Sequence, residues 1–404
     1  MNQLDSADLS PVIERMGGAM ALASSARKHR AFLRARGIKS AVDLLRLAFM
    51  YGPGGYSLRA LAAMAAADDV ADVSDVAVLE RLKRTADWLQ SLCEEALSRV
   101  AAVIGTGLVQ RPIRIVDSSR IEGPGSRVWR LHLCYDAGLA RIVDAAITTT
   151  KDGDRLDRFV ITPGEIRIGD RGFAQPDKIK RALVEGADVL VRLSWKGLQL
   201  TRSGGEPIDW MNLFDQAAAQ GSLDMPVLMH KAHSAFEPVA LRLVLIKKPP
   251  AAAAKARAKT RRASQRNQNR IDPRTLASAD YVILLTSIGC NEFPVSLLGA
   301  FYRLRWQVEL AIKRLKSILH IDRLPAKNAN LARAWLYAHL LLALLLEEAA
   351  AELDALSPSA VERSSDVGLA HHRPSRRGIP GQRLAATKAA THHAHSGQSN
   401  TPNH

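Results

Sequence analysis

The stretch 301–317, FYRLRWQVELAIKRLKS, places four chemically active side chains at helical spacing. Arg305 and Glu309 follow Tyr302 by three and seven residues, and Lys316 comes seven residues after the glutamate. At about 100° per residue of an α-helix, the four side chains fall within a stripe roughly 60° wide. A carboxylate among phosphate-binding groups suits metal-assisted chemistry on a nucleic-acid backbone.

A simpler interpretation of this stretch remains open. Arg305 and Glu309 are also spaced as an ordinary i,i+4 ion pair on a solvated helix face. An amphipathic helix needs a second, apolar stripe that faces the core, and the sequence supplies one. That stripe consists of Leu304, Val308, Ile312, Leu315 and Leu319.

The spacing Tyr-x2-Arg-x3-Glu-x6-Lys resembles the signature of DDE transposases of the insertion-sequence-four family. The resemblance covers roughly residues 40–350, including YGPGGYSL at 51–58 and RLPAKNANLARAWL after the signature stretch. It implies a ribonuclease-H-like catalytic core with two further metal-binding aspartates on strands, the second in an Asp-Arg-Gly-aromatic turn. Asp117 in IRIVDSS and Asp170 in DRGF, which follows EIRIG, occupy the matching positions.

Each aspartate has an alternative role. Asp117 could close a strand as a turn residue, because Asp-Ser-Ser is good turn chemistry. Asp170 could pair with Arg171 in a surface salt bridge. The family often has threonine two residues after the first aspartate, and Ser119 is a small departure from that pattern.

The resemblance also implies roles and a cofactor. Asp117, Asp170 and Glu309 would be the catalytic residues and would bind two Mg²⁺ ions, with Mn²⁺ as a possible substitute. Mg²⁺ prefers such oxygen ligands, and two ions can activate a nucleophile and stabilise the leaving oxygen. The expected DNA-binding residues are Tyr302, Arg305, Lys316, Arg171 and Lys313.

In the family, the tyrosine, arginine and lysine of the signature also stabilise a DNA hairpin with a flipped base. Unstacking a base costs free energy that stacking and phosphate contacts offset. Trp195 and Trp210 are candidates for the stacking aromatic, although a place in the core explains either residue at least as well.

Composition favours a polyanionic partner. The chain has 404 residues, with 56 Lys and Arg against 40 Asp and Glu, a net charge of +16 and a pI near 10.1. Such a charge fits nucleic acid or an anionic membrane surface. The longest apolar run, AWLYAHLLLALLL, is too short for a membrane span and contains His339, so we expect a buried helix.

The compartment is expected to be the bacterial cytoplasm, at the nucleoid. The N-terminal MNQLDSADLSP lacks the features of a signal peptide. Cys93, Cys134 and Cys290 lie far apart and indicate neither a disulfide framework nor a metal site. Expected partners are double-stranded DNA, as terminal inverted repeats and target, and a second copy of the chain in the DNA complex; no membrane is expected.

Residues 1–105 are expected to form an N-terminal helical, DNA-binding domain. Ala-rich periodic segments predict helices over Ala41–Met50, Ser57–Ala67 and Ser74–Ala101, with both leading serines as N-caps. Two short helices around ADDVAD could form a helix-turn-helix, or simply part of a helical bundle.

Residues 106–195 and 280–355 are expected to form the two parts of an α/β core, a ribonuclease-H-like mixed sheet flanked by helices. RLDRFVI predicts a short helix, and the strand order places Asp117 and Asp170 at strand ends. Ser296 is a candidate cap for the signature helix. The expected strands are Ile113–Val116, Arg127–Tyr135, Arg141–Thr149, Glu165–Ile168 and Ala187–Leu193.

Residues 196–279 are expected to be a mostly β insertion with a basic helical arm over Ala251–Asn269, and residues 356–404 a disordered tail. The arm contains no acid, which predicts contacts with the DNA backbone. Its basic residues, with the one that follows, are Lys255, Arg257, Lys259, Arg261, Arg262, Arg266 and Arg270.

The favoured function is a cut-and-paste DNA transposase that cleaves through a hairpin end. A catalytically inactive, transposase-derived DNA-binding repressor is the main alternative. A ribonuclease-H-like repair nuclease is a third possibility, but it would not need the Tyr-Arg-Glu-Lys face.

Overall fold

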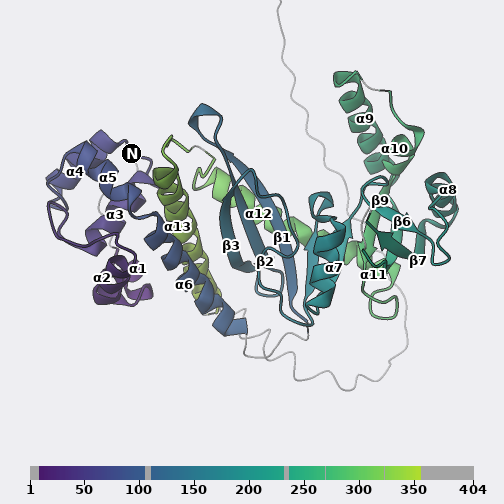
Figure 1. Ribbon diagram of the computed structural model, residues 1–404, viewed down its shortest axis with the longest axis horizontal. Helices are drawn as coiled ribbons and strands as arrows, with labels where there is room; N and C mark the ends of the chain where they lie inside the picture. Colours follow the sequence, from purple (N-terminus) through teal and green to yellow (C-terminus); the bar gives the residue numbers. More distant parts are fainter. Residues whose placement is uncertain (1–8, 105–110, 232–235, 269, 323, 356–404) are drawn as a thin grey trace, which may run out of the picture. The chain divides into compact units, whose positions relative to one another are not determined.

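Nine strands form one mixed sheet in the order β3-β2-β1-β4-β5-β9-β8-β7-β6 (Figure 1). The computed structural model describes residues 9–104, 111–231, 236–268, 270–322 and 324–355, so the expected tail lies outside the described residues. The strands are β1 Ile113–Glu122, β2 Val128–Asp136, β3 Arg141–Thr149, β4 Ile166–Gly169, β5 Asp188–Arg192, β6 Gln199–Thr201, β7 Ser222–His230, β8 Val239–Lys247 and β9 Tyr281–Thr286.

The first five strands confirm the expected mixed five-strand pattern. β1, β2 and β3 form an antiparallel meander, while β4 lies parallel to both β1 and β5. β1 is much longer than predicted, because it remains paired with β2 as far as Glu122 opposite Val128. Asp117 therefore lies in the middle of β1, opposite Leu133, and the prediction that it ends a strand is wrong.

The sheet continues beyond β5. β9 pairs with β5 on one side and with β8 on the other, both antiparallel, and β8, β7 and β6 follow. The residues expected to form an insertion, 196–279, thus contribute three strands to the same hydrogen-bonded sheet. Described residues up to Ala351 form one compact unit.

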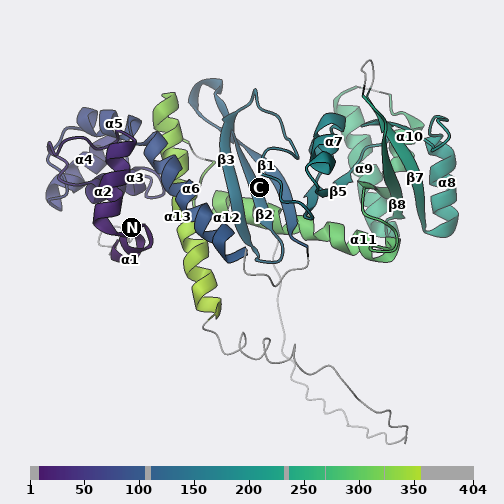
Figure 2. The ribbon, with the colours of Figure 1, turned by 60° about the horizontal axis from the view of Figure 1, so that its bottom comes forward.

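Thirteen α-helices are present in the described residues, with three single-turn 3₁₀ segments, η1 (Pro124–Ser126), η2 (Arg171–Phe173) and η3 (Arg303–Arg305). Figure 2 shows α11 and α12 following one another along the sheet. The helices are α1 Ser10–Arg15, α2 Gly18–Lys28, α3 Ala41–Tyr51, α4 Leu58–Ala67, α5 Asp75–Lys83, α6 Ala86–Ile104, α7 Pro176–Val184, α8 Trp210–Gln220, α9 Pro250–Arg266, α10 Pro273–Ser278, α11 Val295–Tyr302, α12 Trp306–Ser317 and α13 Ala329–Ala355.

Capping decides where the N-terminal helices begin. The Ser57 and Ser74 hydroxyls accept hydrogen bonds from the amides three residues on, which confirms both as N-caps. α4 and α5 pack against each other. The predicted helix over 74–101 is in fact two helices, α5 and α6: the Thr85 hydroxyl donates to the Leu82 carbonyl at the break, and the Thr85 carbonyl accepts the first bond of α6 from Leu89.

Alternating side chains of the sheet build two cores, one on each face. Ile115 and Leu133 belong to the core shared with α3, α6, α12 and α13. Their strand neighbours Val116 and Cys134 belong to the second core, under α7 and α8. Asp117, two residues after Ile115, therefore points to the same face as α12.

The longest helix among the described residues, α13, is a core helix. The helix extends beyond the apolar run AWLYAHLLLALLL, so its segment Ala329–Leu353 is long and apolar enough to cross a membrane by length and composition alone. However, 72% of its most apolar window is buried inside the protein. It lies beside α6 (Figure 1), where the Cys93 thiol donates to the Tyr337 carbonyl.

The signature stretch is not one continuous α-helix. α11 ends at Tyr302, the tighter turn η3 follows, and α12 begins at Trp306. The backbone keeps helical φ and ψ at Tyr302 and Arg305, so the side chains remain roughly on one face. Ser296 is not the cap: Pro294 holds the N-cap position, and Ser296 lies inside the first turn.

Candidate active site

Arg305 is the centre of the interactions in the signature region. Its guanidinium donates to the Glu309 carboxylate at 2.6 Å and lies 3.9 Å from the Asp117 carboxylate on β1. The arginine and Asp117 each expose only 16% of their side chains, and Glu309 exposes 37%. The i,i+4 pair exists, but it faces the sheet aspartate across a partly buried gap rather than open solvent.

Asp117 is held in an unfavourable electrostatic environment. Burial raises the pKa of its carboxyl to about 6, and the negative charges of Asp170 and Glu309 contribute to this increase. The Ser118 amide, which donates to the carboxylate at 2.7 Å, and the charge of Arg305 oppose the increase. Asp170 and Glu309 therefore both lie close enough to Asp117 to influence its carboxyl.

Asp170 follows β4 directly and caps η2. Its carboxylate accepts a hydrogen bond from the Gly172 amide at 2.8 Å, and in the described part of the chain it forms no ion pair with Arg171. A Cβ on Gly172 would meet the Asp154 carboxylate at 3.0 Å and the Asp170 carboxylate at 3.3 Å. A side chain in place of this glycine would require both carboxylates to shift by a few tenths of an ångström.

The three carboxylates are suitable ligands for a hard divalent cation, although their oxygens do not surround one common position in this structure. All three acids offer oxygen, the ligand type that Mg²⁺ and Mn²⁺ take. Within the described residues no three His, Cys, Asp or Glu side chains lie close enough to hold an ion. The Arg305 guanidinium instead supplies the positive charge between Asp117 and Glu309.

The other predicted DNA-binding residues are spread over a larger area. Tyr302 is buried, and the Arg305 guanidinium lies 5.7 Å from its ring centroid. Lys313 and Lys316 line an open hollow of about 470 Å³ together with Glu309. The Lys316 ammonium also donates to the Arg120 carbonyl at 3.4 Å, which ties the end of α12 to β1.

A larger cleft of about 960 Å³ begins at Glu309 and Arg305 and extends to α9. Seven basic and three acidic residues line it, so its charge is strongly positive. No sequence pattern marked Arg192, Lys196 or Lys248 as members of a site. The charged lining residues are Asp170, Arg171, Arg192, Lys196, Lys248, Lys259, Arg270, Asp272, Arg305 and Glu309.

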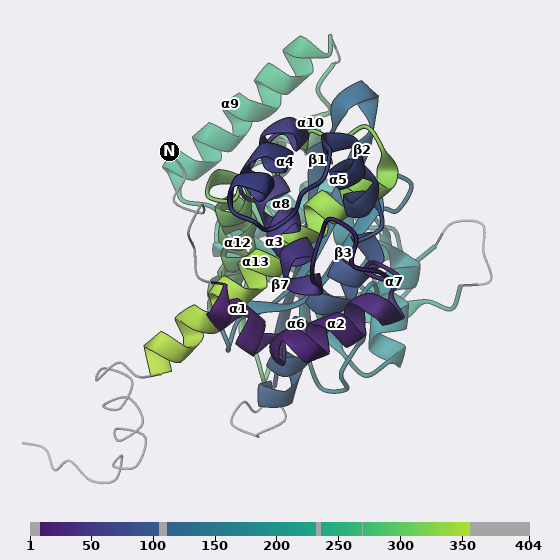
Figure 3. The same ribbon diagram turned by 90° about the vertical axis from the view of Figure 1, so that its left-hand side faces the viewer.

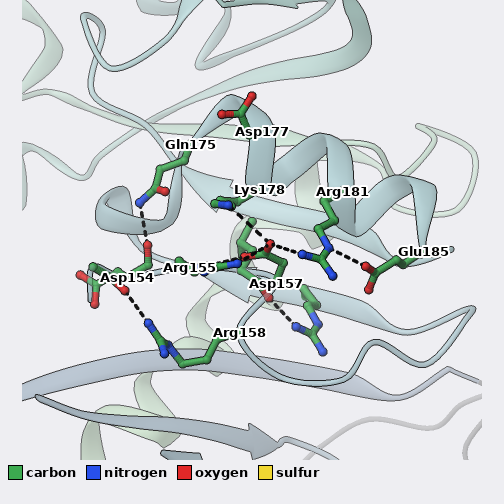
Figure 4. Close-up of polar contacts among 12 residues, drawn as sticks. Asp154, Arg155, Asp157, Arg158, Gln175, Asp177, Lys178, Arg181 and Glu185 are labelled. Carbon is green, nitrogen blue, oxygen red and sulfur yellow. Dashed lines mark hydrogen bonds and ion pairs between the residues drawn. The ribbon is translucent and has the colours of Figure 1, made fainter. Parts of the chain in front are cut away.

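Sequence reasoning also missed Asp154, which ties together the segments that present Asp117 and Asp170. Its carboxylate accepts from the Ser118 hydroxyl and, at 2.5 Å, from Arg130 on β2. Its carbonyl accepts from the Gln175 side chain at 2.6 Å, just after the DRGF turn (Figure 4). A sequence gives no signal for this, because three separate segments meet there.

The segment 155–161, RLDRFVI, is a loop and not the predicted short helix. Asp157 has a fully buried carboxylate there, held by Arg155 and by Lys178 and Arg181 of α7 (Figure 4). The buried Arg167 donates to two carbonyls of the same segment. These side-chain interactions satisfy the loop's polar groups and replace the helix's own hydrogen bonds.

The three tryptophans near the cleft differ in availability. Trp210 is buried in the core under α8, and Trp195 donates to Thr275 and stacks with Arg274 at 4.2 Å. Trp306, which was not among the aromatic candidates from the sequence, exposes 60% of its surface immediately after Arg305.

Removing the charge of Asp117 should stabilise the metal-free protein. The pKa increase from 3.8 to about 6 corresponds to about 3 kcal/mol. Because this pKa is raised in the folded state, the ionised carboxylate opposes folding above about pH 6. Asp117→Asn should therefore increase the free energy of unfolding at neutral pH by up to about 3 kcal/mol, measured by denaturant titration with a chelator present.

The increase in the free energy of unfolding caused by Asp117→Asn should become smaller as the pH falls from about 6 to about 4, because the wild-type carboxyl binds its proton over this range. Asp224→Asn, which breaks a surface pair with Arg242 on β8, serves as the control and should not stabilise. If the Asp117→Asn protein is no more stable than wild type at neutral pH, the electrostatic explanation of the Asp117 environment is wrong.

Comparison with known proteins defines the class. Residues 109–346 match the family model described as the transposase DDE domain, which spans the sheet, the three acids and α12. The chain therefore belongs to the DDE transposases, enzymes that cleave DNA, and to their insertion-sequence-four type. This confirms the resemblance carried by the signature stretch.

Individual relatives come from insertion sequences. The chain is 39% identical over 344 residues to the putative transposase InsL for insertion sequence element IS186A of Escherichia coli K12, covering 84% of this chain and 93% of the relative. It is also 39% identical over 345 residues to the transposase for insertion sequence element IS421 of Escherichia coli, with the same coverage.

Proposed function

We propose that this transposase moves its insertion sequence by a cut-and-paste route. Water attack would free a 3′-OH at each element end, and that hydroxyl would attack the opposite strand to give a hairpin and release the flanking DNA. A second water would open the hairpin and restore the 3′-OH, which would then attack a target phosphodiester and displace its 3′ oxygen. The single observation that carries the proposal is that the charges of Asp170, which follows β4, and of Glu309 on α12 both act on the partly buried Asp117 carboxylate of β1.

Asp117, Asp170 and Glu309 would hold the divalent ions, for which we propose two Mg²⁺ with Mn²⁺ as a substitute. When bound, such ions lower the pKa of the attacking group and neutralise charge on the leaving oxygen. The protein's own contribution is to position the acids on rigid elements. Ser118, Arg130 and Asp154 fix the strand behind Asp117, while Gly172 orients the Asp170 carboxylate.

Arg305, Lys313 and Lys316 would bind backbone phosphates on either side of Glu309, which lines both the cleft and the neighbouring hollow. Arg171 would do so beside Asp170. Tyr302 is buried against Arg305, so its role would be to orient that arginine. Trp306 is the best-placed aromatic to stack on a flipped base at a hairpin end, because it is exposed beside the same arginine.

The remaining expectations extend to partners and organisation. We propose that residues 1–105 contact the terminal inverted repeats, with α4 and α5 as the helix pair nearest to a helix-turn-helix. A homodimer would then bring two element ends together, in the cytoplasm and at the nucleoid. Within residues 106–355, the ribonuclease-H-like core would comprise β1–β5 with α12, and 196–279 its insertion.

The test is cleavage of DNA that carries the element's own ends, identified as inverted repeats flanking the coding region. Purified protein with Mg²⁺ should release the element with hairpin ends, which migrate as covalently joined strands on denaturing gels. A catalytically inactive repressor would bind the same DNA without releasing it. Release with open double-strand breaks, and no joined strands at any time during the reaction, would disprove the hairpin route while leaving cut-and-paste movement intact.

A further inference from the structure

Three basic side chains meet in the cleft next to Asp170. Arg171 belongs to η2, Arg192 ends β5, and Lys248 follows β8. In the described part of the chain none of the three forms an ion pair, and the buried Nε of Arg192 has no hydrogen-bond partner. Like charges held together in this way destabilise the free protein.

The repulsion among these positive charges affects the pKa of Lys248. Burial and then the charges of Arg192 and Arg171 lower the pKa of its ammonium to about 8. The carboxylate of Asp280 opposes this change only weakly, because it is already paired with Arg257 of α9 at 2.5 Å. The ammonium's one hydrogen bond among the described residues goes to the neutral Ala279 carbonyl.

We propose that Arg192 and Lys248 form a binding site for backbone phosphates of the DNA strand that passes Asp170 on its way to α9. An anion between them would remove the mutual repulsion and complete the unmade hydrogen bonds, as guanidinium and ammonium groups do with phosphate. That the bound strand is transposon or target DNA rests on the proposed function. The binding site itself would accept any polyanion.

The shape of the cleft supports a strand rather than an isolated phosphate. Beyond Lys248 the lining includes Lys259 of α9 and Arg270, which follows that helix. The side of α9 that lines the cleft carries mainly small residues, Ala256, Thr260 and Ala263, which allow a backbone to approach closely. Successive phosphates could therefore be bound from Arg192 along the cleft without a side chain blocking their path.

A neighbouring pair of lysines provides a matched experiment. Lys247 and Lys248 are consecutive, but Lys247 is exposed, does not line the cleft, and donates to the Ala218 carbonyl of α8. Lys248→Gln and Arg192→Gln should each weaken binding of a fluorescein-labelled duplex about tenfold. Each should also flatten the plot of log affinity against log salt by about 0.9, whereas Lys247→Gln should change neither.

The measurement uses full-length protein, fluorescence anisotropy, and two duplexes, with and without a terminal inverted repeat. Equal weakening on both duplexes identifies a backbone site, and weakening confined to the repeat would overturn that assignment. Lys248→Arg and Arg192→Lys keep the charge and should keep the affinity, which separates removal of a phosphate-binding charge from misfolding. The proposal would be wrong if Lys248→Gln bound both duplexes as tightly as Lys247→Gln does and showed the same salt slope.

The pH dependence gives a second readout. Wild-type binding should weaken between about pH 7 and pH 9 as Lys248, facing Arg192, Arg171 and Asp280, loses its proton. Lys248→Arg should remain insensitive, since arginine stays charged, and an equal pH response in both proteins would also contradict the proposal. A protein that binds duplex through these residues but never cleaves element ends would contradict the transposition route and leave the phosphate site standing.

Discussion

Glu309→Gln should reduce cleavage of element ends by orders of magnitude while DNA binding persists or tightens. Glutamine preserves the helix and the side-chain volume, and it can still accept a hydrogen bond from Arg305. It removes the anionic ligand and one of the charges that repel a phosphate backbone from the cleft. Cleavage with Mg²⁺ and binding without it, measured on the same labelled element end, separate the two effects.

The chain offers a closely matched control. Arg181 of α7 and Glu185, the C-cap of that helix, form an i,i+4 pair at 2.7 Å. Glu185 is exposed to the same degree as Glu309, 36% against 37%. Glu185→Gln therefore makes the same chemical change away from the three acids and should cleave normally. Wild-type cleavage by Glu309→Gln would disprove the proposed role of this residue.

Asp117→Asn and Asp170→Asn should reduce cleavage as much as Glu309→Gln does. Double replacements should be scarcely worse than single ones, because residues that act as a unit give non-additive effects. Rates that fall multiplicatively in the double variants would instead indicate that the acids act in separate steps.

Neutralising the basic stripe of α9 should cause the largest decrease in DNA affinity. Lys255, Lys259, Arg262 and Arg266 line one continuous surface of this helix, which packs against α10 and otherwise stands out from the sheet (Figure 3). Replacing all four with glutamine should flatten the plot of log affinity against log salt by about 0.9 for each phosphate that the protein no longer neutralises. Titrations of a duplex at several salt concentrations provide the slope.

Arg257 is left out of this set, because the structure pairs it with Asp280 and so supplies an acid that the arm's own sequence lacks. A control with four glutamines at basic positions elsewhere, Lys180, Arg181, Lys231 and Arg274, changes the net charge equally. Each of these four residues pairs with an acid. If the control flattens the slope as much as the α9 variant, total charge rather than the stripe determines binding.

The sequence alone determined the features that depend on local pattern. The spacing from Tyr302 to Lys316 indicated the family because it resembles that family's signature, and helical periodicity predicted that the four side chains share a face. Alternation and turn residues located the first five strands, and Ser57 and Ser74 marked helix starts because capping joins residues three apart. The DRGF turn was recognisable for the same local reason.

Only the tertiary structure decided features that depend on pairing between distant segments. Asp117 could not be placed in mid-strand from the sequence, because the length of β1 depends on its pairing with β2. The β-rich segment 196–279 joined the main sheet because β9 bonds to both β5 and β8. Arg192 and Lys248 meet Asp170 from separate elements, so their shared charge exists only in the folded chain.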